Sequence, residues 1–400
     1  MTRRLTVVSG AAVMVAVFLV TVPTFRHFFD LGVYRGAVRY WLLDGGALYD
    51  FRYQDSEYGF TYPPFAALVL SPLAAMSWPI AIGAGLVVNA GCVALLLRWF
   101  LVPILHRHGW PLWTPVALAF LAVLVFEPAR DTFSYGQVNL LLLVLVCGDL
   151  RNRRCPGVGI GLAAAIKLTP AVFIGYLLLS RQYRAAATGT AAGATAIAFL
   201  LAPDASRVFW TSAVWDTGRI GQPFQVSNQS LRGVLARLDV PGIWWIVAVA
   251  LVVAAWCWWV RTRRPDQLAG FAVTGAVGCL ISPVTWVHHL VWLLPGIFLL
   301  LDHAISNPDP VRRKRRLAGL AAGVTVLSSS LVWVWWADPH GWAAFPGGNA
   351  YVWLTFLLLG VLVTGNCHTH PARCAHCQRR DHTDDHRTGH RDQRSGENIR

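Results

Sequence analysis

Residues 241–264 read PGIWWIVAVALVVAAWCWWVRTRR, a run of twenty uncharged residues followed by a cluster with three arginines. An α-helix rises about 1.5 Å per residue, so about 20 apolar residues cross a hydrocarbon core about 30 Å thick. Similar blocks recur along the 400-residue chain, which is 55% hydrophobic and only 14% charged, whereas soluble domains carry about 25% charged residues. The sequence therefore predicts an all-α, polytopic membrane protein with no large soluble domain.

The first apolar block, residues 5–22, follows Arg3 and Arg4 and has the outline of a signal peptide. No small-residue cleavage site follows it, so we expect a retained helix. About ten spans are expected in all. They lie near 5–22, 79–102, 112–127, 134–149, 185–203, 241–260, 267–282, 287–302, 317–336 and 349–365.

The basic residues lie in short clusters between the apolar blocks rather than on one domain. The formal net charge of +14 therefore indicates membrane orientation and not a nucleic-acid partner. Because cytoplasmic loops are enriched in Lys and Arg, we expect a multi-pass plasma-membrane protein with both termini in the cytoplasm. The clusters span residues 3–4, 98–108, 151–154, 181–184, 261–264 and 312–316.

Residues 157–179 do not fit as a simple span, because basic clusters lie at both ends. The middle of this segment reads Ile166-Lys167-Leu168-Thr169-Pro170, and a lysine and a proline are both unfavourable inside a lipid-facing helix. We expect two half-helices that form a re-entrant hairpin. A single kinked helix with a snorkelling lysine is the alternative.

Residues 63–76 are too short to cross comfortably. Pro63 and Pro64 favour a helix start, and aromatic residues flank the segment. We expect a helix that lies at the outer interface of the membrane.

Most unusual polar residues fall on the noncytoplasmic side of this topology. Asp30 alone is typical of a helix cap, and a histidine pair at the top of a helix is usually interfacial. Several such residues on one face of the membrane are a stronger signal, because polar groups near lipid are costly. A carboxylate there is suited to deprotonate a hydroxyl nucleophile, while cationic or donor groups hold a phosphate.

Neither a nucleotide site nor a metal site is indicated. The glycines of residues 157–161 lie in an apolar run without a preceding strand, so we interpret them as helix-packing residues. No carboxylate cluster points to a metal, and we expect no cofactor. Polar chemistry on one face without a nucleotide signature favours transfer of a sugar from a lipid phosphate.

The chain resembles glycosyltransferase family 87 of actinobacterial envelope assembly, a family of the glycosyltransferase C superfamily, over roughly residues 28–365. The resemblance lies in motifs that follow one another in this order: Asp30-Leu31-x-Val33-Tyr34 with Leu48-Tyr49, Phe60-Thr61-Tyr62-Pro63-Pro64-Phe65, Gly136-Gln137-Val138-Asn139, Ala165-Ile166-Lys167-Leu168-Thr169-Pro170, Asn228-Gln229-Ser230, and Ser282-Pro283 with Trp286 and His288-His289.

The resemblance implies an α-(1→2)-mannosyltransferase with polyprenol-phosphate mannose as donor and a lipid-anchored mannan or phosphatidylinositol mannoside as acceptor. It implies that Asp30 is the catalytic base and that His288 contacts the donor phosphate or organises the acceptor. The expected active site is noncytoplasmic and in contact with membrane lipids. The expected substrate-binding residues are His289, Lys167, Arg232, Asn228, Gln229, Gln137, Asn139, Tyr62 and Trp286.

Two other functions remain open at this point. Related members of the family are arabinofuranosyltransferases that use polyprenyl-phosphate arabinose, and no residue discriminates between the two sugars. A lipid-linked-sugar flippase or transporter would also explain the helices. Transporters usually bind near the midplane between inverted repeats, and no internal repeat is visible.

The hydrophilic residues 366–400 differ from the predicted membrane domain at 1–365. They hold three cysteines and six histidines but almost no aliphatic residues. Zinc binding is one interpretation, but no ligand pairing on a stable scaffold is visible. We expect a disordered cytoplasmic tail.

Overall fold

The computed structural model describes residues 2–22, 26–54, 56–151, 155–182 and 184–365. Within these residues every regular element is a helix, and the only strand-like pairing is an isolated bridge between Asn228 and Trp286. This confirms the all-α prediction. Two units divide the chain, Met1–Leu362 and Val363–Arg400, and every residue of the site belongs to the first. The predicted tail at 366–400 lies outside the described residues.

Four helical stretches of the described chain are long and apolar enough to cross a membrane, which supports a polytopic membrane protein. The figure of about ten spans stays a prediction, because the other apolar helices are shorter or bent. The four stretches are Arg3–Thr21 in α1 (Thr2–Thr21); Trp78–Arg107 in α4 (Trp78–Leu96), η2 (Leu97–Leu101) and α5 (Val102–Arg107); Ile243–Arg263, which is α14; and Val287–Ile305 in η5 (Val287–Leu293) and α16 (Leu294–Ile305).

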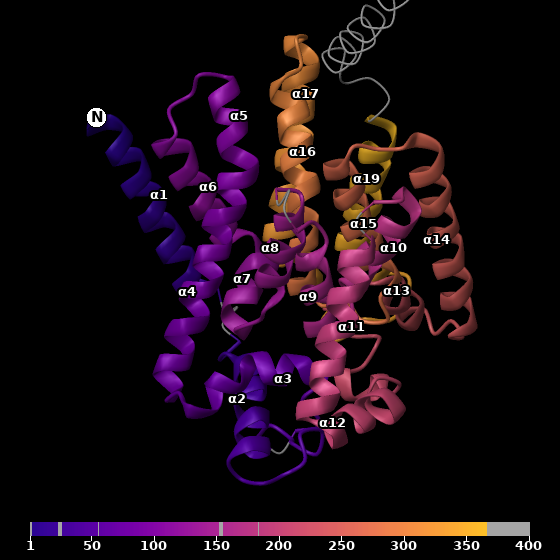
Figure 1. The fold of residues 1–400 in the computed structure, drawn as a ribbon. Coiled ribbons are helices and arrows are strands. Elements are labelled where there is room, and N and C mark those ends of the chain that lie inside the picture. Colours follow the sequence, from indigo (N-terminus) through magenta and orange to yellow (C-terminus); the bar gives the residue numbers. More distant parts are fainter. Residues whose placement is uncertain (1, 23–25, 55, 152–154, 183, 366–400) are drawn as a thin grey trace, which may run out of the picture. The chain divides into compact units, whose positions relative to one another are not determined.

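The shorter helices complete the set of elements that run alongside these stretches (Figure 1). They are α6 (Trp113–Val125), α7 (Glu127–Tyr135), α8 (Asn139–Asp149), α9 (Val158–Ile166), α10 (Ala171–Ser180), α11 (Arg184–Leu201), α15 (Gln267–Ile281), α17 (Pro310–Ser328) and α19 (Ala350–Gly365).

Two of the expected spans differ from the structure. The span near 134–149 is broken, because α7 and α8 meet at an angle of 119° and Gly136 at the bend adopts a left-handed conformation with φ of 70°. The span near 317–336 is displaced. Asp309 caps α17 by accepting from the amide of Val311 at 2.8 Å, so the helix begins at Pro310 inside the basic cluster. It ends at Ser328, and a separate 3-10 helix, η6 (Leu331–Trp335), follows.

The predicted interruption at Lys167 is confirmed. Helix α9 ends at Ile166 and α10 begins at Ala171, so four residues separate the two helices and one continuous kinked helix is not observed. Pro170 is the residue that precedes α10, a position where its missing amide hydrogen is harmless. The re-entrant path through the membrane stays a prediction.

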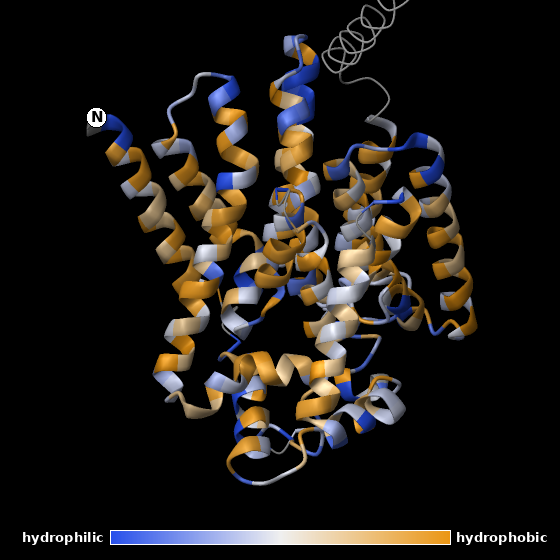
Figure 2. Cartoon of the chain, in the orientation of Figure 1, coloured by the Kyte–Doolittle hydropathy of each residue, from blue (hydrophilic) through white to orange (hydrophobic). Residues whose placement is uncertain are grey.

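Short elements gather at one end of the helices. Helices α2, α3 and α12 lie together at the lower end of Figure 1, and Figure 2 shows hydrophilic segments at the opposite ends of α5, α14 and α17. The expected short helix at residues 63–76 is present as α3 and η1. The elements at this end and in the adjoining loops are α2 (Phe29–Leu42), α3 (Pro64–Leu70), η1 (Ser71–Ala75), α12 (Pro203–Val208), η3 (Phe209–Ala213), η4 (Thr217–Ile220), α13 (Leu231–Arg237) and α18 (Phe345–Gly348).

Glycines bring α9 into close contact with two neighbours, which confirms their interpretation as packing residues. A Cβ atom at Gly159 would collide with the carbonyl oxygen of Leu145 on α8. A Cβ at Gly161 would lie 2.5 Å from the carbonyl oxygen of Ala187 on α11. Backbone therefore meets backbone on both sides of α9.

We expect Gly161→Ala to lower the thermal unfolding midpoint of the purified protein, because the backbone of α11 cannot yield as a flexible side chain would. Overpacking of this kind costs about 1–3 kcal/mol. Gly189→Ala is the matched control, since Gly189 lies on α11 with nothing within 4 Å of the added Cβ. Equal midpoints for the two variants would contradict the close packing of α9 on α11.

Candidate active site

Asp30 lies in the first turn of α2, a helix that the sequence did not predict. The backbone amide of Phe28, just before this helix, donates to the carbonyl oxygen of Ser134 near the end of α7 at 2.9 Å. Gly136 lies against Leu31, because a Cβ on Gly136 would be 2.6 Å from the Leu31 Cβ. These contacts hold the start of α2 against the bend between α7 and α8.

Gln137 is the centre of a buried hydrogen-bond network beside Asp30. Its Oε1 accepts from the Tyr34 hydroxyl at 2.9 Å and from the Tyr62 hydroxyl at 3.1 Å, and the two hydroxyls are 2.8 Å apart. With Oε1 committed to the tyrosines, the amide group of Gln137 hydrogen-bonds to the Asp30 carboxylate. The network fixes the carboxylate in one position.

The environment of Asp30 weakens its acidity. Burial raises the pKa of Asp30 to about 6, because a charged carboxylate loses hydration there. The hydrogen bond from Gln137 and the nearby charge of Lys167 lower the pKa and offset part of this effect. A carboxylate with a pKa near 6 is ionised at neutral pH and is a better base than an ordinary aspartate.

Lys167 projects from the break between α9 and α10 into the same region. Its Nζ lies 3.0 Å from the Asn139 Oδ1 and 3.0 Å from the His289 Nε2, and it is 4.9 Å from the centre of the Tyr62 ring. The backbone amide of Trp286 donates to the His289 Nδ1 at 3.1 Å and so fixes the orientation of the imidazole. Polar groups from three separate parts of the chain therefore converge on one lysine.

His288 is buried next to His289, and its ring is in edge-to-face contact with the Tyr135 ring at 5.2 Å and the His289 ring at 4.7 Å. The Thr132 hydroxyl donates to the backbone carbonyl of His288 at 3.3 Å, which anchors η5 to α7. The His288 Nε2 is buried and has no hydrogen-bond partner within the described chain. An unpaired polar atom in a buried site is a candidate contact for a substrate.

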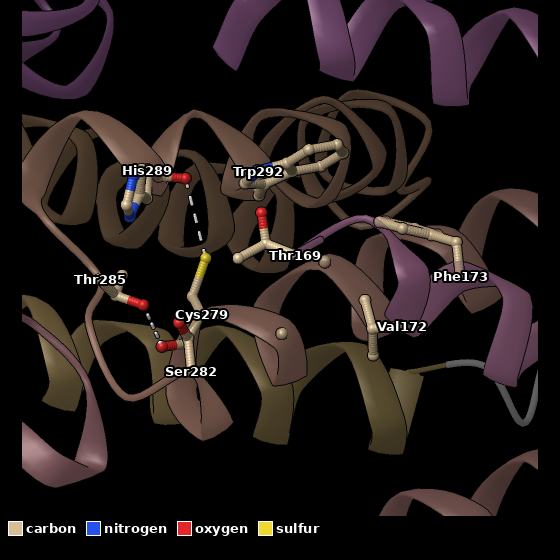
Figure 3. A pocket seen from close by; sticks show the side chains of 10 residues that line it. Thr169, Val172, Phe173, Cys279, Ser282, Thr285, His289 and Trp292 are labelled. Atoms are coloured by element: carbon tan, nitrogen blue, oxygen red, sulfur yellow. Dashed lines mark hydrogen bonds between the residues drawn. The ribbon is translucent and has the colours of Figure 1, made fainter. Parts of the chain in front are cut away.

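A pocket adjoins His289 between α10, α15 and η5 (Figure 3). Val172, Phe173 and Trp292 form an apolar part of its wall, and His289 and Thr285 form a polar part. The Thr285 hydroxyl donates to the carbonyl oxygen of Cys279 at 2.7 Å, which keeps the loop before η5 against α15. The wall of this small pocket is therefore part polar and part apolar.

The described residues contain no group of three His, Cys, Asp or Glu side chains arranged to hold a metal ion. The donor set is a carboxylate, amides, hydroxyls, imidazoles and a lysine. These groups can remove a proton from a hydroxyl and bind a phosphate through their own charges and hydrogen bonds.

Residues 60–283 match the model of glycosyltransferase family 87. The chain belongs to this family. No solved structure matches the chain.

The relatives of this family 87 chain are similar over most of its length. It is 33% identical over 379 residues to the polyprenol-phosphate-mannose-dependent α-(1-2)-phosphatidylinositol mannoside mannosyltransferase of Mycolicibacterium smegmatis, covering 85% of each chain. It is 33% identical over 299 residues to the Mycobacterium tuberculosis protein of the same name, covering 68% of this chain and 69% of the relative. A third relative, the M. smegmatis phosphatidylinositol pentamannoside mannosyltransferase, is 33% identical over 367 residues, covering 85% of this chain and 86% of its own.

Four of the expected substrate-binding residues of the family 87 chain lie outside the cluster around Lys167 or hydrogen-bond to backbone groups. Asn228 accepts from the amide of Thr285 at 2.9 Å, and Gln229 donates to the carbonyl of Gly348 at 2.8 Å. The Trp286 ring packs under Gly221, and Arg232 lies 5.5 Å from the Trp245 ring on α14. The structure therefore joins Asp30, Tyr62, Gln137, Asn139, Lys167, His288 and His289, and does not bring these four side chains into that cluster.

Sequence reasoning missed two residues of the site. Tyr34 lies four positions after Asp30 on α2, and this spacing places both side chains on one face of the helix. The spacing would have indicated Tyr34 if the helix had been predicted. Arg26 precedes α2 and lies over the rings of Trp333 and Tyr135. No local signal joins Arg26 to Trp333, which is more than 300 residues away in the sequence.

The scaffold under Asn228 depends on Arg237, which is buried. The guanidinium donates to Asn349 Oδ1 from Nε at 3.1 Å and to the carbonyl oxygens of Gln225 and Asn228 at 2.8 and 3.1 Å. Arg237 therefore ties the loop before α13 to the start of α19.

We expect Arg237→Met to lower the thermal unfolding midpoint markedly, because it leaves several buried acceptors without a donor. Each unpaired buried group costs about 1–3 kcal/mol. Arg207→Met should leave the midpoint unchanged, since the Arg207 side chain is 76% exposed on α12. If both variants unfold at the same temperature, Arg237 does not hold this loop.

Proposed function

We propose that this chain transfers mannose from polyprenol-phosphate mannose to the 2-hydroxyl of a lipid-linked mannan or phosphatidylinositol mannoside, with inversion at the anomeric carbon. The observation that carries the proposal is the Asp30 carboxylate, held by Gln137 beside Lys167 and the histidine pair. The family 87 relatives, all named as polyprenol-phosphate-mannose-dependent α-(1-2)-mannosyltransferases, supply the sugar and the linkage.

In the proposed reaction Asp30 is the catalytic base. Its carboxylate accepts the proton of the acceptor 2-hydroxyl while an electron pair of that oxygen forms a bond to the anomeric carbon. The bond between this carbon and the phosphate oxygen breaks, and its electron pair stays on the phosphate. A β-linked donor gives an α-linked product by this single displacement, so one base suffices.

His288 and Lys167 are proposed to stabilise the departing phosphate. The unpaired Nε2 of His288 offers a hydrogen bond to it, and Lys167 offers positive charge in a site of low polarity. Asn139 and His289 hold the Lys167 ammonium in place. Tyr62 and Gln137 act by positioning Asp30 rather than by contact with the leaving group.

The donor is proposed to enter from the bilayer. The pocket beside His289 has an apolar wall from α10 and η5, which suits the hydrocarbon chain of a polyprenol next to its phosphate. A soluble nucleotide-sugar would gain nothing from such a wall.

The active site is proposed to face the noncytoplasmic side of the plasma membrane, with both termini in the cytoplasm. Basic residues lie at the ends of α5, α14 and α17 that are opposite to α2 and α3, and basic ends favour the cytoplasm (Figure 2). Asp30 lies at the start of α2 and therefore toward the other side.

The relatives' names favour mannose over arabinose, and transfer over flipping of a lipid-linked sugar. A detergent-solubilised transferase should form a labelled mannolipid from polyprenol-phosphate [³H]mannose and a phosphatidylinositol mannoside. A flippase forms no product without a sealed membrane. Absence of product, or product only with the arabinose donor, would refute the proposal.

Asp30→Asn should abolish transfer in this assay, with a loss of at least about 100-fold, because the amide cannot accept the hydroxyl proton. The variant should elute from size exclusion as the wild type does, since Asn preserves the shape of the side chain. A folded Asp30→Asn protein with full activity would exclude Asp30 as the base.

The pH dependence follows from the raised pKa of Asp30. Only the ionised carboxylate is a base, so kcat/KM should fall as the pH decreases through about 6. Gln137→Leu removes a hydrogen bond that favours the ionised form, so its acid limb should move to higher pH. A wild-type limb near the ordinary aspartate value of about 4 would contradict this environment.

A further inference from the structure

Arg26 is a cation placed between aromatic rings at the edge of the site. Its guanidinium carbon lies 4.3 Å from the centre of the Trp333 ring and 5.8 Å from the centre of the Tyr135 ring. The carbonyl of Arg26 accepts from the amide of Phe29 at 3.1 Å, which fixes the residue at the turn before α2. Cation–π contacts hold a guanidinium in place and leave its hydrogen-bond donors free.

One buried donor of Arg26 lacks an acceptor in the described chain. Its Nε is buried with no hydrogen-bond partner, and no ion pair with a described carboxylate is formed within 4.0 Å. The charge of Arg26 acts on Asp131 of α7, but only from beyond bonding distance. A guanidinium has five N–H donors and is costly to bury without an acceptor. An anion bound next to Arg26 would supply that acceptor.

His288 provides a second unpaired group close by. The Tyr135 ring contacts both side chains, since it lies 5.2 Å from the His288 ring and 5.8 Å from the Arg26 guanidinium carbon. Two independent buried nitrogens without partners, Nε of Arg26 and Nε2 of His288, therefore border the same tyrosine.

We propose that Arg26 binds the phosphate of the polyprenyl donor together with His288, an inference that rests on the proposed function. A guanidinium matches the oxygens of a phosphate through two parallel hydrogen bonds, and its charge persists at every physiological pH. Arg26 thus neutralises the phosphate as the glycosidic bond breaks.

The proposal gives the departing phosphate a second cation besides Lys167. Lys167 acts electrostatically on Asp30, and its ammonium is already engaged by Asn139 and His289. The Arg26 guanidinium lies against the rings of Trp333 and Tyr135. Arg26 therefore adds its charge and its paired donors to the charge of Lys167 at the phosphate.

The acceptor also carries a lipid phosphate, so the test must separate two anions. Purified wild-type protein, Arg26→Gln and Arg26→Lys are titrated with polyprenyl phosphate, with polyprenol of equal length, and with phosphatidylinositol. Binding is measured by the ligand-induced shift of the thermal unfolding midpoint. Arg207→Gln, a change at an exposed arginine, is the control for net charge.

Arg26→Gln should bind polyprenyl phosphate about 10- to 100-fold more weakly than the wild type, the range expected for loss of a hydrogen bond to a charged group. Its affinity for polyprenol should be unchanged. Arg26→Lys should recover part of the loss, because a lysine keeps the charge but not the paired donors. The kcat for mannose transfer should be highest in the wild type, lower in Arg26→Lys and lowest in Arg26→Gln. Arg207→Gln should match the wild type.

Unchanged affinity of Arg26→Gln for polyprenyl phosphate, or a loss confined to phosphatidylinositol, would overturn the proposal. Equal losses for polyprenol and polyprenyl phosphate would also overturn it, because they would show a general effect on the fold. A wild-type protein that neither binds polyprenyl phosphate nor forms mannolipid would refute the proposed function itself. The two failures are distinguishable, because the proposed function is tested by the wild type alone and the role of Arg26 is tested by the variants.

Discussion

Contact between the start of α2 and the bend at Gly136 brings Asp30 to Gln137, the centre of the buried hydrogen-bond network. Gly136 has no side chain, so the backbone of the bend reaches Leu31, and the amide of Phe28 bonds to Ser134. The turn then directs Gln137 to Asp30 and begins α8 at Asn139, which meets Lys167. A larger residue at 136 would separate the base from the groups that orient it.

The sequence was sufficient for the helical class, for most apolar helices and for the break at Lys167. Each of these depends on local properties, namely hydropathy over about 20 residues or a proline and a lysine in an apolar run. The bend at Gly136 was missed for the same reason, since residues 134–149 have the hydropathy of a straight span. Gly136 ends α7 in a left-handed conformation, with the amide of Gln137 bonded to the carbonyl oxygen of Thr132 at 2.9 Å, but its contact with Leu31 joins distant parts of the chain and no local pattern reveals it.

The site residues divide in a similar way. The order of the motifs identified the family and joined Asp30 with Gln137, Asn139, Lys167 and the histidine pair. It could not show which polar side chains also satisfy buried backbone groups, as those of Asn228 and Gln229 do. Arg232 and Arg237 differ only in which face of a short helix they occupy, and only the packing of α13 distinguishes them.

The glycine contacts of α9 have a consequence for how this enzyme can diverge. Because α9 meets α8 and α11 through backbone atoms at Gly159 and Gly161, the position of α9, and with it Lys167, depends on the spacing of the helix axes. Substitutions on the lipid-facing surfaces of those neighbours can accumulate without moving the ammonium group. Residues that face the lipid can therefore change while the positions of the reacting groups stay the same. This allows homologues to adapt to different bilayers while keeping one reaction.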